Sequence, residues 1–283
     1  MKYIYLTLFA LLALVGRSLG QESEGAMPST TETERPTESL TLPPLTEFLY
    51  PTDKVLGPAS GPRILVGLFG GVISNSHSGI FSLREDGILC CQFDGASSVG
   101  PTVALRGDYF PDAKGFWGIS LRAGWEDQSA EFESEVEQLL IFGKDNEPEK
   151  ADFQNRLSAS LSAISISPLA MFKLLDFDLY FSAGPTITLY SSPTFDKTEQ
   201  ILGPTGVTYL DGSTEVDFPD IPVDGVSSST IGFTAGLDLR YPLTENIYLG
   251  SELHYRLPLT KITTDEEWNV SNIIATIGAS LAL

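Results

Sequence analysis

Basic residues are scarce in this chain of 283 residues, which has 17 Lys and Arg against 37 Asp and Glu. The formal net charge of -20 argues against a nucleic-acid-binding protein, because phosphate contacts are made mainly by lysine and arginine. Charged residues of both signs reach only 19%, which is low for a soluble surface. Composition alone leaves both a soluble β-protein and a membrane barrel open.

The N-terminus carries the features of an export signal. Lys2 provides a positive start, residues 4–15 are almost wholly apolar, and Ser18 and Gly20 are the small residues that signal peptidase requires. The apolar run is too short for a comfortable membrane span, which takes ~20 residues. We therefore expect residues 1–20 to be a signal peptide that is removed.

Residues 21–62 lack any hydrophobic period and are rich in proline, threonine and glutamate. Such a segment cannot bury enough apolar surface to offset the entropy of ordering it. The sequence predicts a disordered linker on the periplasmic side. It serves as a spacer in the simpler interpretation and as a tether or partner-binding segment in the other.

From residue 63 onward, apolar and polar residues alternate with a period of two. Eight stretches show the alternation, at 64–70, 102–109, 117–126, 156–163, 178–189, 230–241, 247–257 and 272–283. Several are longer than the ~5–6 residues usual in globular strands and match the ~9–11 of transmembrane strands. In the fourth stretch Leu157, Leu161 and the alanines between and after them form the apolar face. The phase of that stretch then slips near Ile164 and Pro168, which predicts a β-bulge.

The two faces of these strands differ in a way that favours a membrane barrel. One face is apolar with aromatic residues near its ends, which suits lipid and its interfaces. The other is rich in Gly, Ser and Thr with isolated charges, which suits a narrow, filled interior. Short connections at 111–115, 173–176 and 243–246 alternate with long ones at 72–98, 127–152, 191–229 and 261–267. Outer-membrane barrels have the same alternation of short periplasmic turns and long outer loops.

These features resemble the small outer-membrane β-barrels of Gram-negative bacteria, of the OmpA and OmpX type, over residues 63–283. The segment 273–283 resembles the terminal strand that barrel-assembly machinery reads, although it ends in Leu283 where that signal usually has phenylalanine. The resemblance implies an all-β, eight-stranded, antiparallel, up-and-down transmembrane barrel in the cell outer membrane. We expect no peptidoglycan-binding domain of the OmpA type, since Leu283 ends the last predicted strand.

An eight-stranded barrel is just filled by its own side chains, so we expect a closed interior rather than a diffusive pore. Charges on the polar faces should pair there, since unpaired buried charges cost several kcal/mol each. We expect this ion-pair network to contain Arg106, Asp108, Arg122, Glu126, Arg156, Asp178, Asp238, Arg240, Glu252, His254 and Arg256.

Histidine and cysteine are nearly absent, with two residues of each. His254 lies on a polar face beside Glu252 and Arg256, but the sequence places no nucleophile near it, and the His-x-Ser pair of lipid A deacylases is missing. His77 lies in the first long loop. We therefore expect no enzyme and no catalytic residue.

Cys90 and Cys91 are adjacent in the first long loop. In an oxidising cell envelope they admit a redox or metal site, or a vicinal disulfide that stiffens the loop. Two thiolates alone make a poor zinc site, so we expect the disulfide, no metal site and no cofactor.

The long loops are acidic, and two contain hairpin signals, Asp86-Gly87 and Asp211-Gly212. We expect the strands to continue outside the membrane as rigid ridges that could bind an extracellular protein partner. Other expected partners are outer-membrane lipid and lipopolysaccharide, contacted through divalent cations. A solvated, repulsive acidic surface is the simpler interpretation.

The function expected from the sequence is that of a monomeric barrel with a structural or interaction role, which displays acidic loops. Three alternatives remain: a narrow gated, porin-like channel, a lipid-modifying enzyme, and a secreted soluble β-barrel that binds an apolar ligand. The last alternative requires apolar faces that point inward and charged faces that point outward.

Overall fold

A computed structural model describes residues 63–85, 88–112, 114–142, 148–175, 178–209, 211–221, 225–264 and 267–283. The expected signal peptide and linker lie outside these residues, as does the Asp86-Gly87 dipeptide. All the described residues belong to the second of two compact units, Val55–Leu283. No helix in the described part of the chain is long and apolar enough to cross a membrane.

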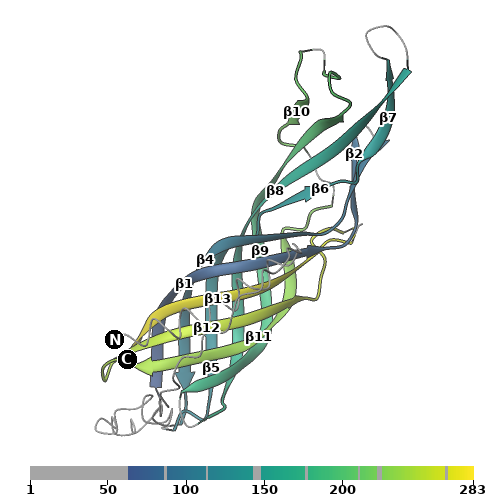
Figure 1. Ribbon diagram of the computed structural model, residues 1–283. Helices are drawn as coiled ribbons and strands as arrows, with labels where there is room; N and C mark the ends of the chain where they lie inside the picture. Colours follow the sequence, from purple (N-terminus) through teal and green to yellow (C-terminus); the bar gives the residue numbers. More distant parts are fainter. Residues whose placement is uncertain are drawn as a thin grey trace, which may run out of the picture. The chain divides into compact units, whose positions relative to one another are not determined.

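Eight antiparallel strands form a closed ring, which confirms the predicted fold class (Figure 1). Following the ring, the strands are β9 (Leu179–Gly203), β11 (Ser229–Pro242), β12 (Ile247–Pro258), β13 (Asn269–Ala282), β1 (Arg63–Ser78), β4 (Ala96–Phe110), β5 (Trp117–Asp127) and β8 (Pro148–Lys173). Pairing of β8 with β9 closes the ring. Each strand pairs with its neighbours in sequence, and β13 pairs with β1, so the connectivity is up-and-down.

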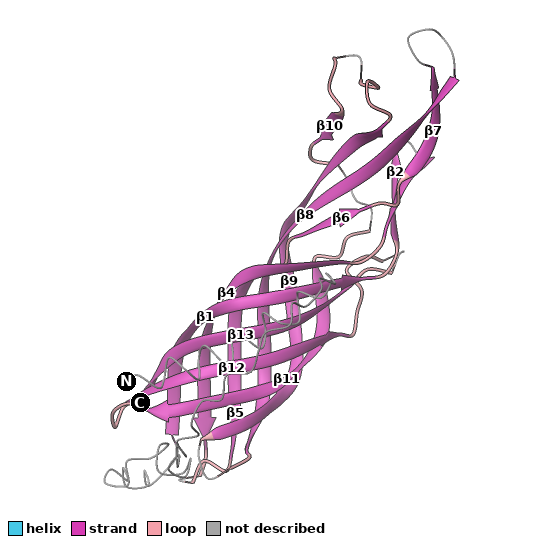
Figure 2. Cartoon of the chain, in the orientation of Figure 1, coloured by secondary structure: helices cyan, strands magenta, loops and turns pink. Residues whose placement is uncertain are grey.

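The short connections all lie at one end of the barrel and the long ones at the other. Tight turns join β4 to β5, β8 to β9 and β11 to β12. The long connections contain the remaining strands, β2 (Phe81–Glu85), β3 (Ile88–Phe93), β6 (Ala130–Glu133), β7 (Glu137–Phe142) and β10 (Glu215–Phe218). β6 and β7 pair with β8, and β10 pairs with β9, beyond the ring (Figure 2). We call this part the outer extension: β6, β7, β10 and the parts of β8 and β9 beyond Ser162 and Ser191.

The outside of the ring is apolar and the inside is polar. Residues such as Leu68, Leu105 and Leu121 are 62%, 57% and 54% exposed on the outer surface. Arginines and carboxylates occupy alternate, buried positions of β4, β5, β11 and β12. This is the reverse of a soluble barrel with an apolar cavity, so the alternative of a secreted apolar-ligand carrier is wrong. A charged core inside an apolar surface is the distribution of a barrel that crosses a membrane.

β8 shows where the apolar band ends. Its outward residues are apolar from Phe172 to Ile164 and polar from Ser162 to Gln154, whereas Leu157 and Leu161 point inward and are fully buried. The prediction that Leu157 to Ala163 form the lipid-facing side is therefore wrong. The apparent phase slip arises because the apolar residues change from the inward to the outward face while the strand continues.

The predicted bulge near Ile164 and Pro168 is also wrong. The pairs Ile166–Ile187 and Ala170–Ala183 share one register, and the β8–β9 register shifts lie instead at 152/153 and 160/162. A Cβ atom built on Gly184 would lie 2.0 Å from the carbonyl oxygen of Pro168. Glycine at that position therefore allows the two strands to approach where proline cannot donate to the ladder.

One of the two predicted hairpins differs from the expectation. β2 and β3 form an antiparallel pair on either side of the Asp86-Gly87 dipeptide. Around Asp211-Gly212, by contrast, β10 pairs with β9 rather than with the residues before the turn. The amide and hydroxyl of Ser213 donate to the Asp211 carboxylate, at 2.9 and 2.7 Å, and lower the pKa of that carboxyl group.

Candidate functional site

The barrel interior contains four arginines, four carboxylates and one histidine, all from β4, β5, β11 and β12. Each lies at an inward position of a strand that alternates from outside to inside. They are at most 7% exposed: Arg106, Asp108, Arg122, Glu126, Asp238, Arg240, Glu252, His254 and Arg256. Equal numbers of Arg and Asp or Glu make this core formally neutral, which limits the cost of removing its charges from water.

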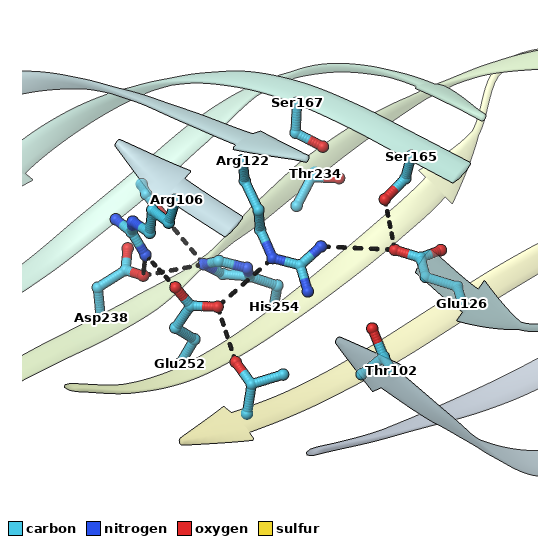
Figure 3. A network of polar contacts seen from close by, with 12 residues as sticks. Thr102, Arg106, Arg122, Glu126, Ser165, Ser167, Thr234, Asp238, Glu252 and His254 are labelled. Atoms are coloured by element: carbon cyan, nitrogen blue, oxygen red, sulfur yellow. Dashed lines mark hydrogen bonds and ion pairs between the residues drawn. The ribbon is translucent and has the colours of Figure 1, made fainter. Parts of the chain in front are cut away.

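Arg106 is the centre of the part of the network nearer the short turns (Figure 3). Its Nε lies 2.9 Å from Asp108 Oδ1, and its Nη1 contacts Asp238 and, at 2.5 Å, Glu252 Oε1. Asp238 and Glu252 are opposed across the β11–β12 ladder, where two carboxylates alone would repel. The guanidinium of Arg106 offsets that repulsion from across the barrel.

Glu126 is the centre of the part nearer the long loops. Arg256 donates to both of its carboxylate oxygens, at 2.6 and 2.8 Å, in a bidentate pair. Ser165 donates to Glu126 at 2.6 Å, and Gln128 donates at 3.0 Å. Both oxygens of this buried carboxylate therefore accept hydrogen bonds, from donors on β12, on β8 and in the loop after β5.

Arg122 connects the two parts, and it is held less tightly than the other arginines. Its Nη1 lies 3.4 Å from Glu126 and its Nε lies 3.4 Å from Glu252. Its Nη2 has no hydrogen-bond partner among the described residues. Arg122 therefore lies between two carboxylates without a short bond to either.

Apolar clusters close the barrel on both sides of the charged core. Nearer the short turns, Phe110, Met171 and Tyr180 pack with Leu65, and the Arg240 guanidinium stacks 5.3 Å from the Phe110 ring. Nearer the long loops lies a larger cluster, which we call the cap: Cys91, Phe93, Ala130, Phe132, Leu157, Ala159, Leu161, Ala163, Tyr190, Phe195, Ile262, Trp268 and Val270. The interior is thus a packed core in three layers.

Two residues predicted in the interior network are not there. Arg156 lies at an outward position of β8 in the outer extension, where it is exposed and 3.5 Å from Glu133. Asp178 lies at the short-turn end, half-buried, with Lys173 at 2.8 Å. The prediction for Arg156 is wrong because the inward face of β8 becomes apolar above the membrane band.

His254 has a neighbour that the sequence did not indicate. Ser182 Oγ lies 3.2 Å from His254 Nε2, and Asp238 Oδ1 lies 3.2 Å from the same nitrogen. A catalytic triad requires the acid and the nucleophile on opposite ring nitrogens. This Ser–His–Asp group does not have that geometry and is enclosed in the barrel core.

His77 lies near the end of β1 and packs against the cap, rather than in an open loop. It is 2% exposed, and Trp268 Nε1 donates to its Nδ1 at 3.2 Å. The Phe132 ring packs edge-on at 5.4 Å between centroids. His77 is therefore enclosed by aromatic rings.

Cys91 is buried in the cap and is half of a disulfide. For Cys90 the structure describes only the backbone, in β3. The vicinal bond between them therefore stays a prediction. Within the described ranges, no three His, Cys, Asp or Glu residues are placed to hold a metal ion.

Several members of the interior network were missed by the sequence analysis. Ser165, Ser182 and Thr276 lie on inward faces and donate to or contact the network. Alternation alone could have placed them inside, but not opposite a given charge. Gln128 follows the end of β5, and only the fold brings it to Glu126.

No known protein-family model matches the chain. No curated protein matches it either. Solved structures with a similar fold include Ail of Yersinia pestis, in complex with the heparin analogue sucrose octasulfate, at 12% identity and a TM-score of 0.29, over 79% of this chain and 99% of that one. OprG from Pseudomonas aeruginosa is 15% identical with a TM-score of 0.37, over 79% and 96%. Neisserial surface protein A is 12% identical with a TM-score of 0.29, over 76% and 96%. The likeness concerns the fold alone.

Proposed function

We propose that the chain is an integral outer-membrane protein with a structural and interaction role: a closed barrel that anchors a rigid, acidic outer extension. The observation that carries the proposal is the inversion along β8. Its outward face is apolar through the barrel and polar beyond Ser162, while its inward face carries Ser165 and Ser167 at the charged core and is apolar in the cap. One strand therefore provides a lipid-facing segment followed by a water-facing one.

Export by the N-terminal signal places the barrel in the outer membrane of a Gram-negative envelope, because that membrane takes exported barrels. Each barrel is a monomer within its membrane. Carboxylates of the outer extension, among them Glu131, Glu133 and Asp217, are exposed beyond the apolar band, on the side where we place the lipopolysaccharide phosphates. Divalent cations would bridge the two kinds of anion.

The role we propose is not enzymatic. Both histidines are enclosed, His77 in the cap and His254 in the charged core, at 2% and 1% exposure. A base that contacts neither solvent nor lipid has no access to a lipid substrate.

A gated channel is the second candidate, and the weakly held Arg122 is the observation that favours it. The apolar layers on both sides of the charged core favour a closed barrel interior instead.

Fractionation tests the proposal. Membranes are extracted with sodium carbonate, and the pellet is run in detergent with and without boiling. We expect the protein in the pellet, with a band that shifts on boiling, and a mature N-terminus at Gln21. A protein that washes off as a soluble species would contradict the proposal. Failure of an antibody against the outer extension to bind intact cells would contradict the outward orientation.

A further inference from the structure

β7 has an unpaired edge. In the described part of the chain it pairs with β8 alone, in the register Glu137–Phe153 to Leu140–Lys150 and beyond. On its other side β7 pairs with no strand among the described residues, and Figure 1 shows it at the margin of the outer extension. The other edge strands of the outer extension are protected differently. β10 is only four residues long and presents Glu215 and Asp217. Ser134, directly after β6, forms an antiparallel β-bridge with Phe93.

The sequence of β7 does nothing to block pairing. Glu-Gln-Leu-Leu-Ile-Phe contains no proline, glycine, lysine or arginine, which are the residues that usually protect an edge or weaken a strand. Leu139 and Leu140 are 47% and 71% exposed and, as neighbours in a strand, point to opposite faces. The complement of this edge is therefore an extended backbone with apolar side chains on both faces.

The position of β7 limits which strands can reach it. β5 runs toward the long loops, β8 runs back, and β7 is antiparallel to β8, so β7 runs away from the membrane. From Ile164, the last apolar outward residue of β8, the strand continues 11 to 16 residues to the segment that pairs with β7. At about 3.3 Å per residue, this corresponds to roughly 35 to 50 Å of strand. The open edge thus lies near the outermost part of the described chain.

We propose that this edge pairs antiparallel with β7 of a second copy anchored in a facing membrane. The inference rests on the proposed outer-membrane placement. Two copies in one membrane both direct β7 outward and could pair only in parallel, which would place Glu137 beside Glu137 of the second copy. Copies in facing membranes run in opposite directions and avoid that repulsion.

The register follows from the symmetry. Two copies of one strand offer free backbone groups at the same alternate positions, so opposed residues differ by an even number. The pairing that keeps apolar residues together is centred on Leu140, with Leu140 opposite Leu140 of the second copy and Leu139 opposite its Ile141. One such six-residue pair is weak, but many copies on each surface make contact multivalent.

The acidic charge of the outer extension predicts the salt dependence. Exposed carboxylates on both surfaces repel, and raising ionic strength from 0.1 to 1 M shortens the screening length from about 10 to about 3 Å. Contact between two membranes should therefore strengthen as salt is added, as expected for an apolar pairing opposed by charge.

Two-colour proteoliposomes carrying the full chain test the proposal, with clustering read by fluorescence and light scattering. Wild-type vesicles should cluster, and more so at high salt. Leu140→Lys and Leu140→Glu vesicles should each lose clustering, whereas a mixture of the two should regain it, since opposite charges then meet at the centre of the pairing. Leu202→Lys, a change of the same kind at a 49% exposed leucine on β9, is the matched control and should cluster like the wild type.

Two results would overturn the inference: wild-type vesicles that never cluster, or clustering that survives Leu140→Lys. If the mixture of Leu140→Lys and Leu140→Glu vesicles failed to cluster, the register would be overturned. Insertion is checked first by the band shift on boiling. Failure to insert counts against both the proposed function and the pairing, whereas insertion without clustering counts against the pairing alone.

Discussion

Glu126 has the largest number of short bonds among the acids of the charged core. Arg256 contributes two, and Ser165 and Gln128 one each, all at 3.0 Å or less. A buried carboxylate with all its partners contributes little net stability compared with an apolar residue of similar volume. The same carboxylate is costly once a partner is lost, because the charge is then left uncompensated.

Arg256→Ala should therefore destabilise the barrel by about 3 to 5 kcal/mol. The measurement is the urea midpoint of unfolding in detergent micelles, followed by tryptophan fluorescence. The double variant Glu126→Gln/Arg256→Met removes both charges at similar volume and should recover a large part of the loss. An Arg256→Ala midpoint equal to that of the wild type would show that the pair is not buried as described.

β8 combines two environments in one continuous strand. Ile166 is 38% exposed at an outward position inside the apolar band, and Ser160 is at an outward position beyond it. β8 runs without a break through both residues, in one register with β5 as far as Ser162, and its register with β9 shifts between Ser160 and Ser162. The boundary of the membrane is thus encoded by side chains rather than by a break in the strand.

Lysine substitutions on β8 locate that boundary. Ile166→Lys should cost about 2 to 4 kcal/mol of folding into lipid, because it places a charge in the hydrocarbon region. Ser160→Lys is the matched control on the same face and should fold like the wild type. The folded fraction in vesicles is read from the band shift on boiling. Equal folding of both variants would contradict the position of the apolar band.

The cap packs residues of the outer extension against residues at the long-loop end of the barrel. Trp268 is 1% exposed and contacts His77, Phe132 and Phe195 within 6.0 Å between ring centroids. Loss of such a ring leaves a cavity that surrounding strands cannot fill. The barrel beneath is held by its own charged core and by lipid.

Trp268→Ala should destabilise the outer extension by about 3 to 5 kcal/mol while the barrel stays folded. Limited proteolysis of vesicles should then cut the extension rapidly, and the remaining barrel should still shift on boiling. Leu202→Ala, which removes a half-exposed side chain, is the control and should stay resistant. Simultaneous loss of the boiling shift would show that cap and barrel unfold as one unit.

For the molecule as a whole, the three layers of the interior decide whether it conducts. The charged core is neutral, and apolar clusters lie on both sides of it. Ion passage would need all three layers to open. We therefore treat the interior as structural and the outer extension as the part that meets other molecules.

Planar-bilayer recordings test that view. Wild-type protein should show no stable conductance. Arg122→Ala removes the residue that links the two parts of the network, and should lower the unfolding midpoint without opening a current, since the cap and the Phe110 cluster remain. A steady current in Arg122→Ala alone would favour the gated channel.

The sequence by itself determined the strand alternation, the short and long connections, and hence the eight-stranded barrel. These are local properties, because a period of two and a turn of a few residues need no distant partner. For the same reason the sequence located Arg106, Glu126 and Arg256 on inward faces, although it did not determine which of the charged residues form ion pairs with one another. Ser182 beside His254 is 72 residues away and was invisible to it.

Only the tertiary structure decided which face of a strand points into the barrel at each position along the barrel axis. Alternation reports that one face of β8 is apolar, not whether lipid or a protein core covers it. Leu157 and Ile166 are both apolar, yet the first packs in the cap and the second faces outward in the apolar band. The choice depends on residues of β6 and β9 and on Trp268, which lie far away in sequence. Whether lipid, water or protein covers a given face is a property of the assembled barrel, because burial depends on what packs against a residue and not on the residue itself.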